Sequence, residues 1–112
     1  MSLDQFDDIP VPAELSALVE RGLVDWEPWG LMESAEATTR RNHMRTRYPQ
    51  RYIPFARRFD CDDVACFDAG RPGRVVVVHD FASPGRQERQ EPCTFQEWFA
   101  SLLSCMVEHD LS

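Results

Sequence analysis

A chain of 112 residues is long enough for one domain with a single hydrophobic core and too short for two. Its formal net charge of −7 disfavours nucleic acid as the primary ligand, because phosphate groups are bound mainly by Lys and Arg. The same charge favours a basic protein partner through long-range attraction, although solubility alone is the simpler explanation of it.

We expect residues 1–10 to form a loose acidic segment ahead of the folded domain. This segment has neither the positively charged start nor the apolar run of a secretory signal, and no stretch of about 18 apolar residues follows that would span a membrane. The sequence therefore predicts a cytoplasmic protein with no membrane partner, whose cysteines are reduced. Cys66 and Cys105 are expected to pack as small hydrophobic side chains. The cysteines are Cys61, Cys66, Cys93 and Cys105.

A first helix is predicted to begin after Val11. Pro12 suits the first helical position, and Gly22 suits the left-handed residue that follows a helix. One apolar stripe supports it at helical spacing. The stripe consists of Val11, Leu15, Leu18 and Val19.

Residues 24–32 form an irregular or short-strand segment, and we expect Trp26 and Trp29 to anchor it to the core. A second helix is predicted from Ser34 to about Tyr48 and is stopped by the following proline. Its charges run from acidic to basic, which complements the helix dipole. Its apolar stripe is thin, so we expect the helix to lie on the surface. The stripe consists of Ala37, Met44 and Tyr48.

Three strands are expected next. Residues 51–57 contain Pro54, which restricts that strand to a sheet edge or a bulge. Residues 63–68 have the character of a central strand, and residues 68–73 join them to the next strand as a hairpin loop. Residues 74–79 carry consecutive valines, a pattern typical of a strand covered on both faces.

Residues 82–92 are predicted to be a solvated loop. A final helix starts at Thr94, which forms a capping box with Glu97. We expect one apolar face of this helix to be buried against the sheet. That face consists of Phe95, Trp98, Phe99, Leu102, Leu103, Met106 and Val107.

The elements together predict a single α+β domain over residues 1–112, with a small, mainly antiparallel sheet, a meander, packed by N-terminal, middle and C-terminal helices. Several short motifs occur in it in a recognisable order. They are Trp-Gly-Leu-Met at 29–32 before a charged helix, Tyr-Ile-Pro-Phe-Ala at 52–56, a hairpin from 62–68 to 75–79, and Thr-Phe-Gln-Glu at 94–97. With these motifs, residues 24–108 resemble the SUKH superfamily, named for fungal cell-wall-assembly regulators and including many bacterial proteins.

The family is best known for bacterial immunity proteins, which bind and neutralise secreted polymorphic toxins, often nucleases. The resemblance implies a non-catalytic domain that binds a protein partner stoichiometrically and uses no cofactor. An immunity protein acting on a basic toxin domain is the first expectation. A regulatory or housekeeping interaction module on the same fold, with no toxin partner, is the alternative, and a small hydrolase is a distant third.

For the partner surface, the sequence suggests exposed aromatic anchors and an acidic rim. Carboxylates are dense at the start of the predicted central strand, and another closes it. The candidate partner-binding residues are Asp60, Asp62, Asp63, Asp68, Trp26 and Trp29.

Metal binding is not expected at these acids or at the cysteines. A calcium loop that began at Asp60 would need Gly and Glu where the chain has Ala65 and Arg71. The cysteines lack the two closely spaced pairs of a structural zinc site.

No catalytic group is expected either. His79 and Asp80 are adjacent in a predicted strand and therefore point to opposite faces, so adjacency does not make them a dyad. A basic cluster on the second helix could contact RNA or an acidic partner, but dipole complementarity and a solvated face explain it more simply. The cluster consists of Arg40, Arg41, Arg45, Arg47 and Arg51.

Overall fold

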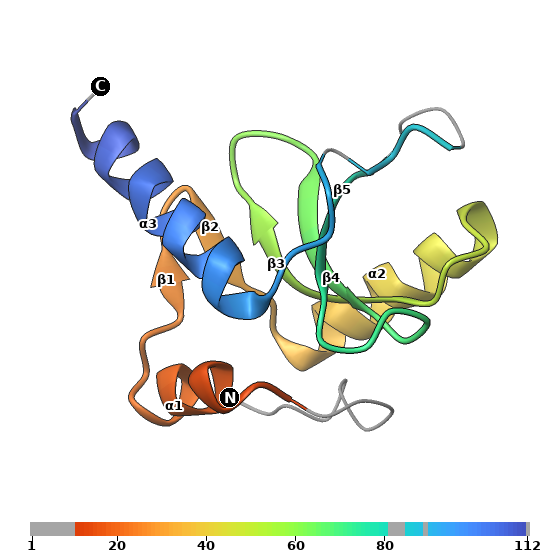
Figure 1. Cartoon of the computed structure of the whole chain (residues 1–112), viewed down its shortest axis with the longest axis horizontal. Coiled ribbons are helices and arrows are strands. Elements are labelled where there is room, and N and C mark those ends of the chain that lie inside the picture. Colours follow the sequence, from red (N-terminus) through yellow and green to blue (C-terminus); the bar gives the residue numbers. More distant parts are fainter. Residues whose placement is uncertain (1–10, 81–84, 89, 112) are drawn as a thin grey trace.

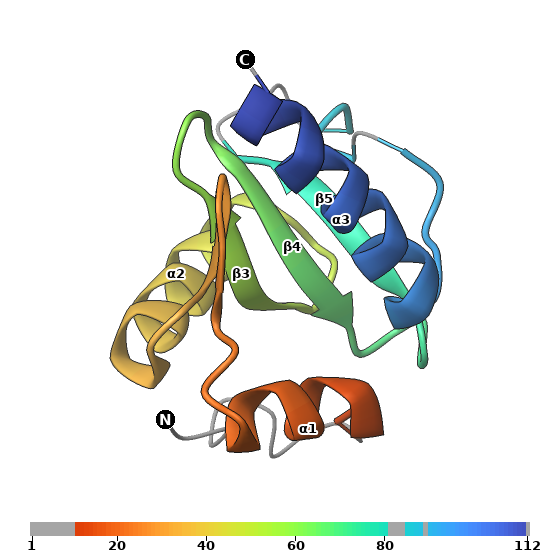
Figure 2. The same ribbon diagram turned by 90° about the vertical axis from the view of Figure 1, so that its left-hand side faces the viewer.

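The computed structural model describes residues 11–80, 85–88 and 90–111. It consists of one antiparallel sheet in the order β1-β2-β3-β4-β5, so strands that follow one another in the chain are neighbours in the sheet. Helix α3 packs across one face, α2 lies on the opposite face, and α1 lies beside one end of the sheet (Figures 1 and 2). This architecture confirms the predicted α+β meander.

The elements follow the predicted order closely. The helices are α1 (Ala13–Glu20), α2 (Ser34–Arg47) and α3 (Phe95–Leu111). The strands are β1 (Asp25–Trp26), β2 (Trp29–Leu31), β3 (Tyr52–Arg58), β4 (Asp63–Asp68) and β5 (Val75–His79). In the segment 24–32, the irregular or short strand expected from the sequence is the hairpin of β1 and β2.

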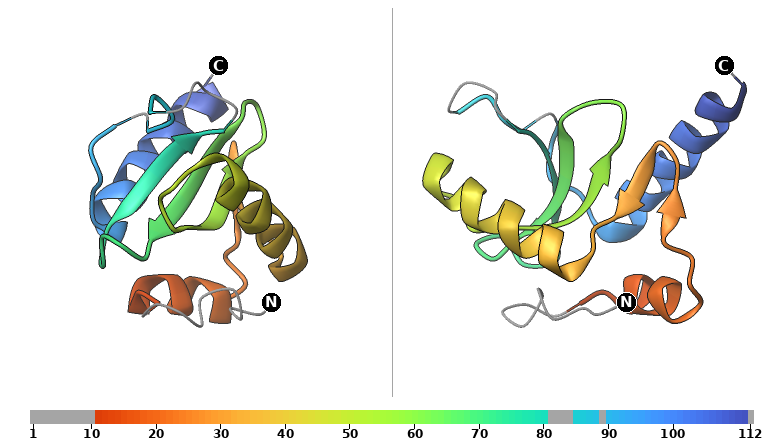
Figure 3. Two further views of the ribbon diagram at one scale, coloured as in Figure 1. Left: turned by 90° about the vertical axis from the view of Figure 1, so that its right-hand side faces the viewer. Right: turned by 180° about the vertical axis from the view of Figure 1, so that it is seen from behind.

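The sheet separates two layers of buried side chains, because alternate residues of a strand point to opposite faces. Val75 and Val77 of β5 belong to the core shared with α1 and α3, while Val76 and Val78 belong to the core under α2. The left view of Figure 3 looks onto the face that α2 covers. All four valines are buried, which confirms that this strand is covered on both faces.

Pro54 lies in a strand with a neighbour on each side, but β2 pairs only with residues 56–58, so Pro54 itself has a ladder partner only in β4, at Cys66. Strand β3 pairs with β2 on one side and with β4 on the other. The pairing register with β4 shifts between Pro54 and Ala56, which marks a bulge or irregularity. The bulged alternative predicted for this strand is therefore supported, because a bulge accommodates a residue that cannot donate a ladder hydrogen bond.

The predicted helix ends are largely confirmed. Gly22 lies just past α1 with φ 69°, the left-handed conformation that glycine adopts most readily. Pro12, predicted as the first helical residue, instead precedes the helix as its N-cap. At α3, the Thr94 N–H donates to Glu97 Oε1 at 3.0 Å, and the Glu97 N–H donates to Thr94 Oγ1 at 3.2 Å. These reciprocal bonds form the predicted capping box.

The predicted apolar face of α3 is only partly buried. Phe95, Trp98 and Leu102 are buried in the core, but Leu103 is 49% exposed and Val107 is 59% exposed. The expectation of one fully buried face was wrong for these two residues. At about 100° per residue, the seven apolar positions span roughly 180°, which is wider than one sheet face can cover.

The segment predicted to be a solvated loop is not wholly solvated in its described part, residues 85–88 and 90–92. Gln87 is buried. A backbone bridge joins Glu88 to Val78, and a second bridge joins Cys93, the first residue after the loop, to Val75. This part of the chain therefore lies along the outer edge of β5, an edge that would otherwise expose unpaired backbone groups.

Candidate functional site

The acidic residues predicted to form one rim lie at two ends of β4. Asp60 and Asp62 are exposed in the turn between β3 and β4, and Asp63 opens β4. Asp68 closes the same strand, about 16 Å away at roughly 3.3 Å per residue, and is 4% exposed. The structure therefore brings together the first three acids and separates Asp68 from them.

Asp68 has a local structural role. Its Oδ1 accepts a hydrogen bond from the Gly70 N–H at 2.9 Å, and its Oδ2 accepts one from Arg71 Nε at 2.8 Å. Both bonds lie within the β4–β5 hairpin loop. The inclusion of Asp68 in an exposed rim was wrong, because its carboxylate closes this turn.

Trp26 and Trp29 are core residues. They are 4% and 5% exposed, and each ring packs edge-to-face on Trp98 of α3, with centroids 6.1 and 5.5 Å apart. Their expected role of anchoring the segment 24–32 to the core is confirmed. Their proposed role as exposed anchors for a partner is contradicted, because the rings are covered by α3.

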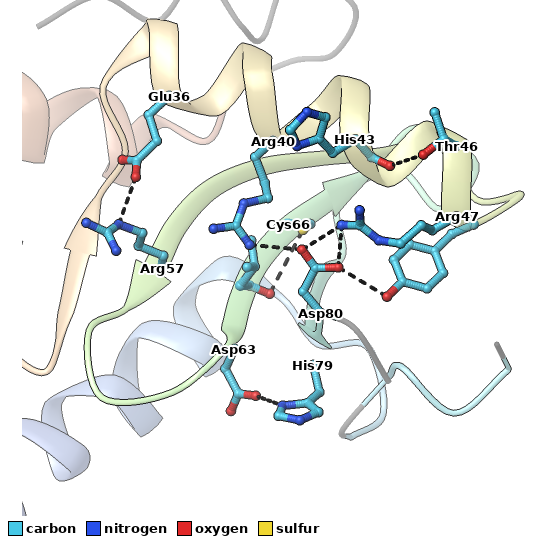
Figure 4. A network of polar contacts seen from close by, with 12 residues as sticks. Glu36, Arg40, His43, Thr46, Arg47, Arg57, Asp63, Cys66, His79 and Asp80 are labelled. Atoms are coloured by element: carbon cyan, nitrogen blue, oxygen red, sulfur yellow. Dashed lines mark hydrogen bonds and ion pairs between the residues drawn. The ribbon is translucent and has the colours of Figure 1, made fainter. Parts of the chain in front are cut away.

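A polar network under α2 is centred on Asp80, directly after β5 (Figure 4). Its side chain is wholly buried. Arg47 Nη2 donates to both carboxylate oxygens, at 2.6 and 2.8 Å, and Arg40 Nη1 donates to Oδ2 at 2.9 Å. The Tyr48 hydroxyl donates to Oδ1 at 3.2 Å. The charge of Asp80 is thus compensated by two guanidinium groups from one helix.

This arrangement changes the interpretation of the basic cluster on α2. Arg40 and Arg47 direct their guanidinium groups toward Asp80 and keep only about a quarter of their side chains in solvent, 26% and 28%. Arg45 and Arg51 are exposed. The solvated-face explanation fits Arg45 and Arg51, fails for Arg40 and Arg47, and is weakened for Arg41, which is half-buried. A hollow of about 480 Å³ lies beside the network, lined by α2 and Asp80.

His79 and Asp80 point to opposite sides of the sheet, as the sequence indicates. His79 lies opposite Asp63 in the β4–β5 ladder, and its Nδ1 is 2.9 Å from Asp63 Oδ1. Figure 4 shows this pair apart from the Asp80 network. The histidine therefore pairs across the sheet with an acid of the predicted rim, and this pairing was not visible from sequence adjacency.

A second polar network fastens the segment beside β5. The Tyr52 hydroxyl donates to Glu88 Oε2 at 2.6 Å and accepts from Gln87 Nε2 at 3.1 Å. Arg71 donates to both oxygens of Glu88, at 3.1 and 2.5 Å. The Arg71 guanidinium lowers the pKa of Glu88, and burial raises the pKa of Tyr52. The network joins β3, the β4–β5 loop and this segment.

An apolar groove of about 380 Å³ runs between α1 and α3. Its apolar lining includes Leu18, Leu23, Phe99, Ala100 and Leu103. Leu23 is 53% exposed and Leu103 is 49% exposed, so apolar side chains meet solvent along it. Sequence reasoning missed this surface, although the excessive width of the apolar arc of α3 was a signal for it.

Other kinds of site find little support in the part of the chain that the structure describes. There, no three His, Cys, Asp or Glu side chains are grouped so that they could hold a metal ion. None of the described helices combines the length and the apolarity that crossing a membrane requires. Cys66 is buried, and its burial raises the pKa of the thiol; Cys105 packs at the border of the core.

Comparison of the chain with protein-family models, curated protein sequences and solved structures finds no match in any of the three.

Proposed function

We propose that this chain is a non-catalytic protein-binding domain of the SUKH type, and that it neutralises a bacterial polymorphic toxin by stoichiometric binding. The motifs at residues 29–32, 52–56 and 94–97 carry the family resemblance. The observed order of elements, a meander followed by a capped last helix, agrees with what that resemblance implies.

The observation that carries a binding role is the apolar surface along α1 and α3. Leu23, Leu103 and Val107 are each about half exposed, whereas most other large apolar side chains of the described residues are buried or partly buried. Apolar groups that border a groove in a folded monomer commonly mark a site that another protein covers. One side of helix α3 would therefore pack on the sheet, and its other side would bind a partner.

In this proposal, a toxin domain binds at the groove between α1 and α3. Its binding would bury Leu103 at the centre of the contact. Full burial of a leucine contributes about 1.5–3 kcal/mol, and Leu103 is already half covered, so loss of this one side chain should weaken the complex by about threefold to tenfold.

The test uses the full chain and a toxin domain encoded beside its gene, where one is found. The chain should protect cells that express the toxin, and calorimetry should give a 1:1 complex. Leu103→Asp should weaken binding without unfolding the chain, because the residue is exposed. Ser104→Asp is the matched control, since it adds the same charge at the adjacent exposed position of α3.

Two results would speak against this function. If a neighbouring toxin were neither bound nor neutralised, or if no toxin gene lay nearby, a regulatory interaction module on the same fold would be favoured. If Ser104→Asp weakened the complex as much as Leu103→Asp, the effect would be one of charge, and the groove would not be the contact.

A further inference from the structure

Phe59, in the turn between β3 and β4, is a large aromatic side chain that the fold leaves in solvent. It is 54% exposed, whereas every Trp and Tyr of the chain is buried. Its backbone is fixed, because the Phe59 N–H donates to the Pro28 carbonyl oxygen at 2.8 Å, in the turn between β1 and β2. The exposed ring is therefore carried by a residue whose backbone position is fixed by a hydrogen bond.

The ring of Phe59 lies against the backbone of Gly30. A Cβ atom built on Gly30 would be 2.4 Å from Phe59 Cζ, closer than any side chain could tolerate without moving the ring. Gly30 does not have a positive φ, so its conformation does not demand glycine. Glycine in a strand weakens the strand, and here its absence of a side chain makes room for the ring.

Arg57 holds the ring from another side. Its guanidinium carbon lies 5.0 Å from the centroid of the Phe59 ring, which is within cation–π range. Arg57 Nε in turn pairs with Glu36 Oε2 of α2 at 2.9 Å, a contact visible in Figure 4. A side chain that is ordered before binding loses less conformational entropy in a complex, and aromatic side chains are frequent binding hot spots.

The charges beside Phe59 indicate the chemistry of what could cover it. Asp60 follows it directly, Asp62 stands two residues further on, and both are exposed. Arg58 donates to both oxygens of Asp60, at 2.6 and 3.1 Å, which orders that carboxylate and compensates part of its charge. With a net charge of −7, the whole chain would also attract a basic protein and repel an acidic one.

We propose that residues 57–63, the β3–β4 tip, dock a basic protein surface. Phe59 enters an apolar pocket of the partner, and Asp60 and Asp62 face its Lys or Arg side chains. The proposal rests on the proposed protein-binding function and assigns to it a contact surface separate from the groove of α1 and α3. The competing structural explanation is that Phe59 only covers Gly30 and thereby protects the sheet.

The experiment uses a defined probe and needs no toxin. Binders to the full chain are selected from a displayed library of small domains with Lys- and Arg-rich surfaces, and their affinities are measured against variants. Phe59→Ser and Asp62→Arg should each weaken most of the selected binders by about tenfold or more. Glu20→Arg, an equal change of charge at an exposed residue of α1, should leave them within about threefold.

Gly30→Ala separates docking from a purely structural role. The added methyl displaces the ring while Phe59 stays in the chain, so selected binders should weaken about as they do for Phe59→Ser. Thermal unfolding shows whether each variant is folded, and Phe59→Leu, which keeps an apolar side chain there, replaces Phe59→Ser if the latter unfolds.

The proposal is overturned if most selected binders tolerate Phe59→Ser and Asp62→Arg, or if they are weakened by Leu103→Asp instead. It is also overturned if Gly30→Ala alone leaves binding intact and, when combined with Phe59→Ser, restores the stability that Phe59→Ser loses. Phe59 would then act only as a cover for Gly30. Because the probe is a selected domain, none of these results depends on whether a toxin is found.

Discussion

Arg47 of α2 and Asp80 at the end of β5 form a forked contact, in which Nη2 of the arginine lies 2.6 and 2.8 Å from the two oxygens of a carboxylate with no exposed surface. Burial of a charge is costly unless that charge is paired, so the aspartate depends on its arginines. The contact ties the helix on one face of the sheet to the strand end beneath it.

Replacement of Arg47 by Met should therefore destabilise the fold. We expect a loss of about 1–3 kcal/mol, less than for a fully buried pair, because the arginine is partly in solvent and Arg40 still compensates Asp80. Urea unfolding measures the loss. Arg45→Met removes an exposed charge from the same last turn of α2 and should cost much less.

A double-mutant cycle identifies the source of that loss. In a chain that already carries Asp80→Asn, the further change Arg47→Met should cost less than it does in the wild type. An equal cost in both backgrounds would show that the arginine stabilises the protein through packing and not through this carboxylate.

Removal of the Tyr52 hydroxyl should also destabilise the domain. The ring is 1% exposed, and its hydroxyl bonds both Glu88 and Gln87. We expect Tyr52→Phe to cost about 1–2 kcal/mol, because a charge-assisted bond is lost and a buried amide loses a partner. Hydrogen exchange should locate the effect in residues 85–88 and β5; a loss spread evenly over the sheet would argue against this local role.

The Glu88–Arg71 contact makes part of the stability dependent on pH. The pKa of Glu88 in the folded chain lies below its ordinary value of 4.5, since Arg71 favours its ionised form. The corresponding stability is present above pH 4.5 and is lost as the pH falls through the folded pKa.

Urea unfolding of Glu88→Gln across pH 3–5 should accordingly show a smaller loss on acidification than the wild type. Arg71→Met removes the cause of the lowered pKa and should reduce the pH dependence in the same way. If both variants followed the wild-type curve, the contact would not contribute to acid sensitivity.

The capping box at α3 gives a prediction of its own. Thr94→Ala removes the acceptor of the Glu97 N–H and should cost about 1 kcal/mol, or roughly 4–6 °C in the midpoint of thermal unfolding. Ser104→Ala, within the same helix, is the control and should change the midpoint little. A cost equal for both variants would deny the cap a specific role.

The thiols should differ in reactivity. Burial raises the pKa of the Cys66 thiol strongly and also raises that of Cys61, but Cys61 is exposed whereas Cys66 is buried. A thiol reagent should label Cys61 in the native protein and reach Cys66 only when the chain unfolds. Mass spectrometry along a urea series checks this, and labelling of Cys66 well before the unfolding transition would indicate a local opening of the α2 face.

Local signals in the sequence were sufficient for most of the elements. The valines of β5 and the Thr94–Glu97 pair each specify a strand or a helix start within a few residues, and the structure places both as expected. Strand β4 has the predicted bounds, Asp63–Asp68. Such features depend on residues that are close in the sequence, so the spacing of apolar and polar residues is enough to predict them.

Partners distant in sequence could not be inferred in the same way. The carboxylate of Asp80 takes its arginines from a helix 33 and 40 residues earlier, and Gln87 finds Tyr52 at a separation of 35. The positions of Trp26 and Trp29 in the sequence likewise do not show whether their rings are covered by α3 or exposed to solvent. The two residues were therefore assigned both to the core and to a partner surface. The apolar arc of α3 was visible, but how much of it the sheet covers was not.

Because each strand of the sheet pairs with the one before it, most of the sheet can assemble through short hairpins with little loop-closure entropy. The bonds from Arg40 and Arg47 to Asp80 are different, since they enclose β3, β4 and β5, and thus the β3–β4 and β4–β5 hairpins, between their ends. Their formation requires that both hairpins already be in place. Helix α2 should thus consolidate after the meander, and folding rates should respond more to changes in β3 and β4 than to changes at Arg47.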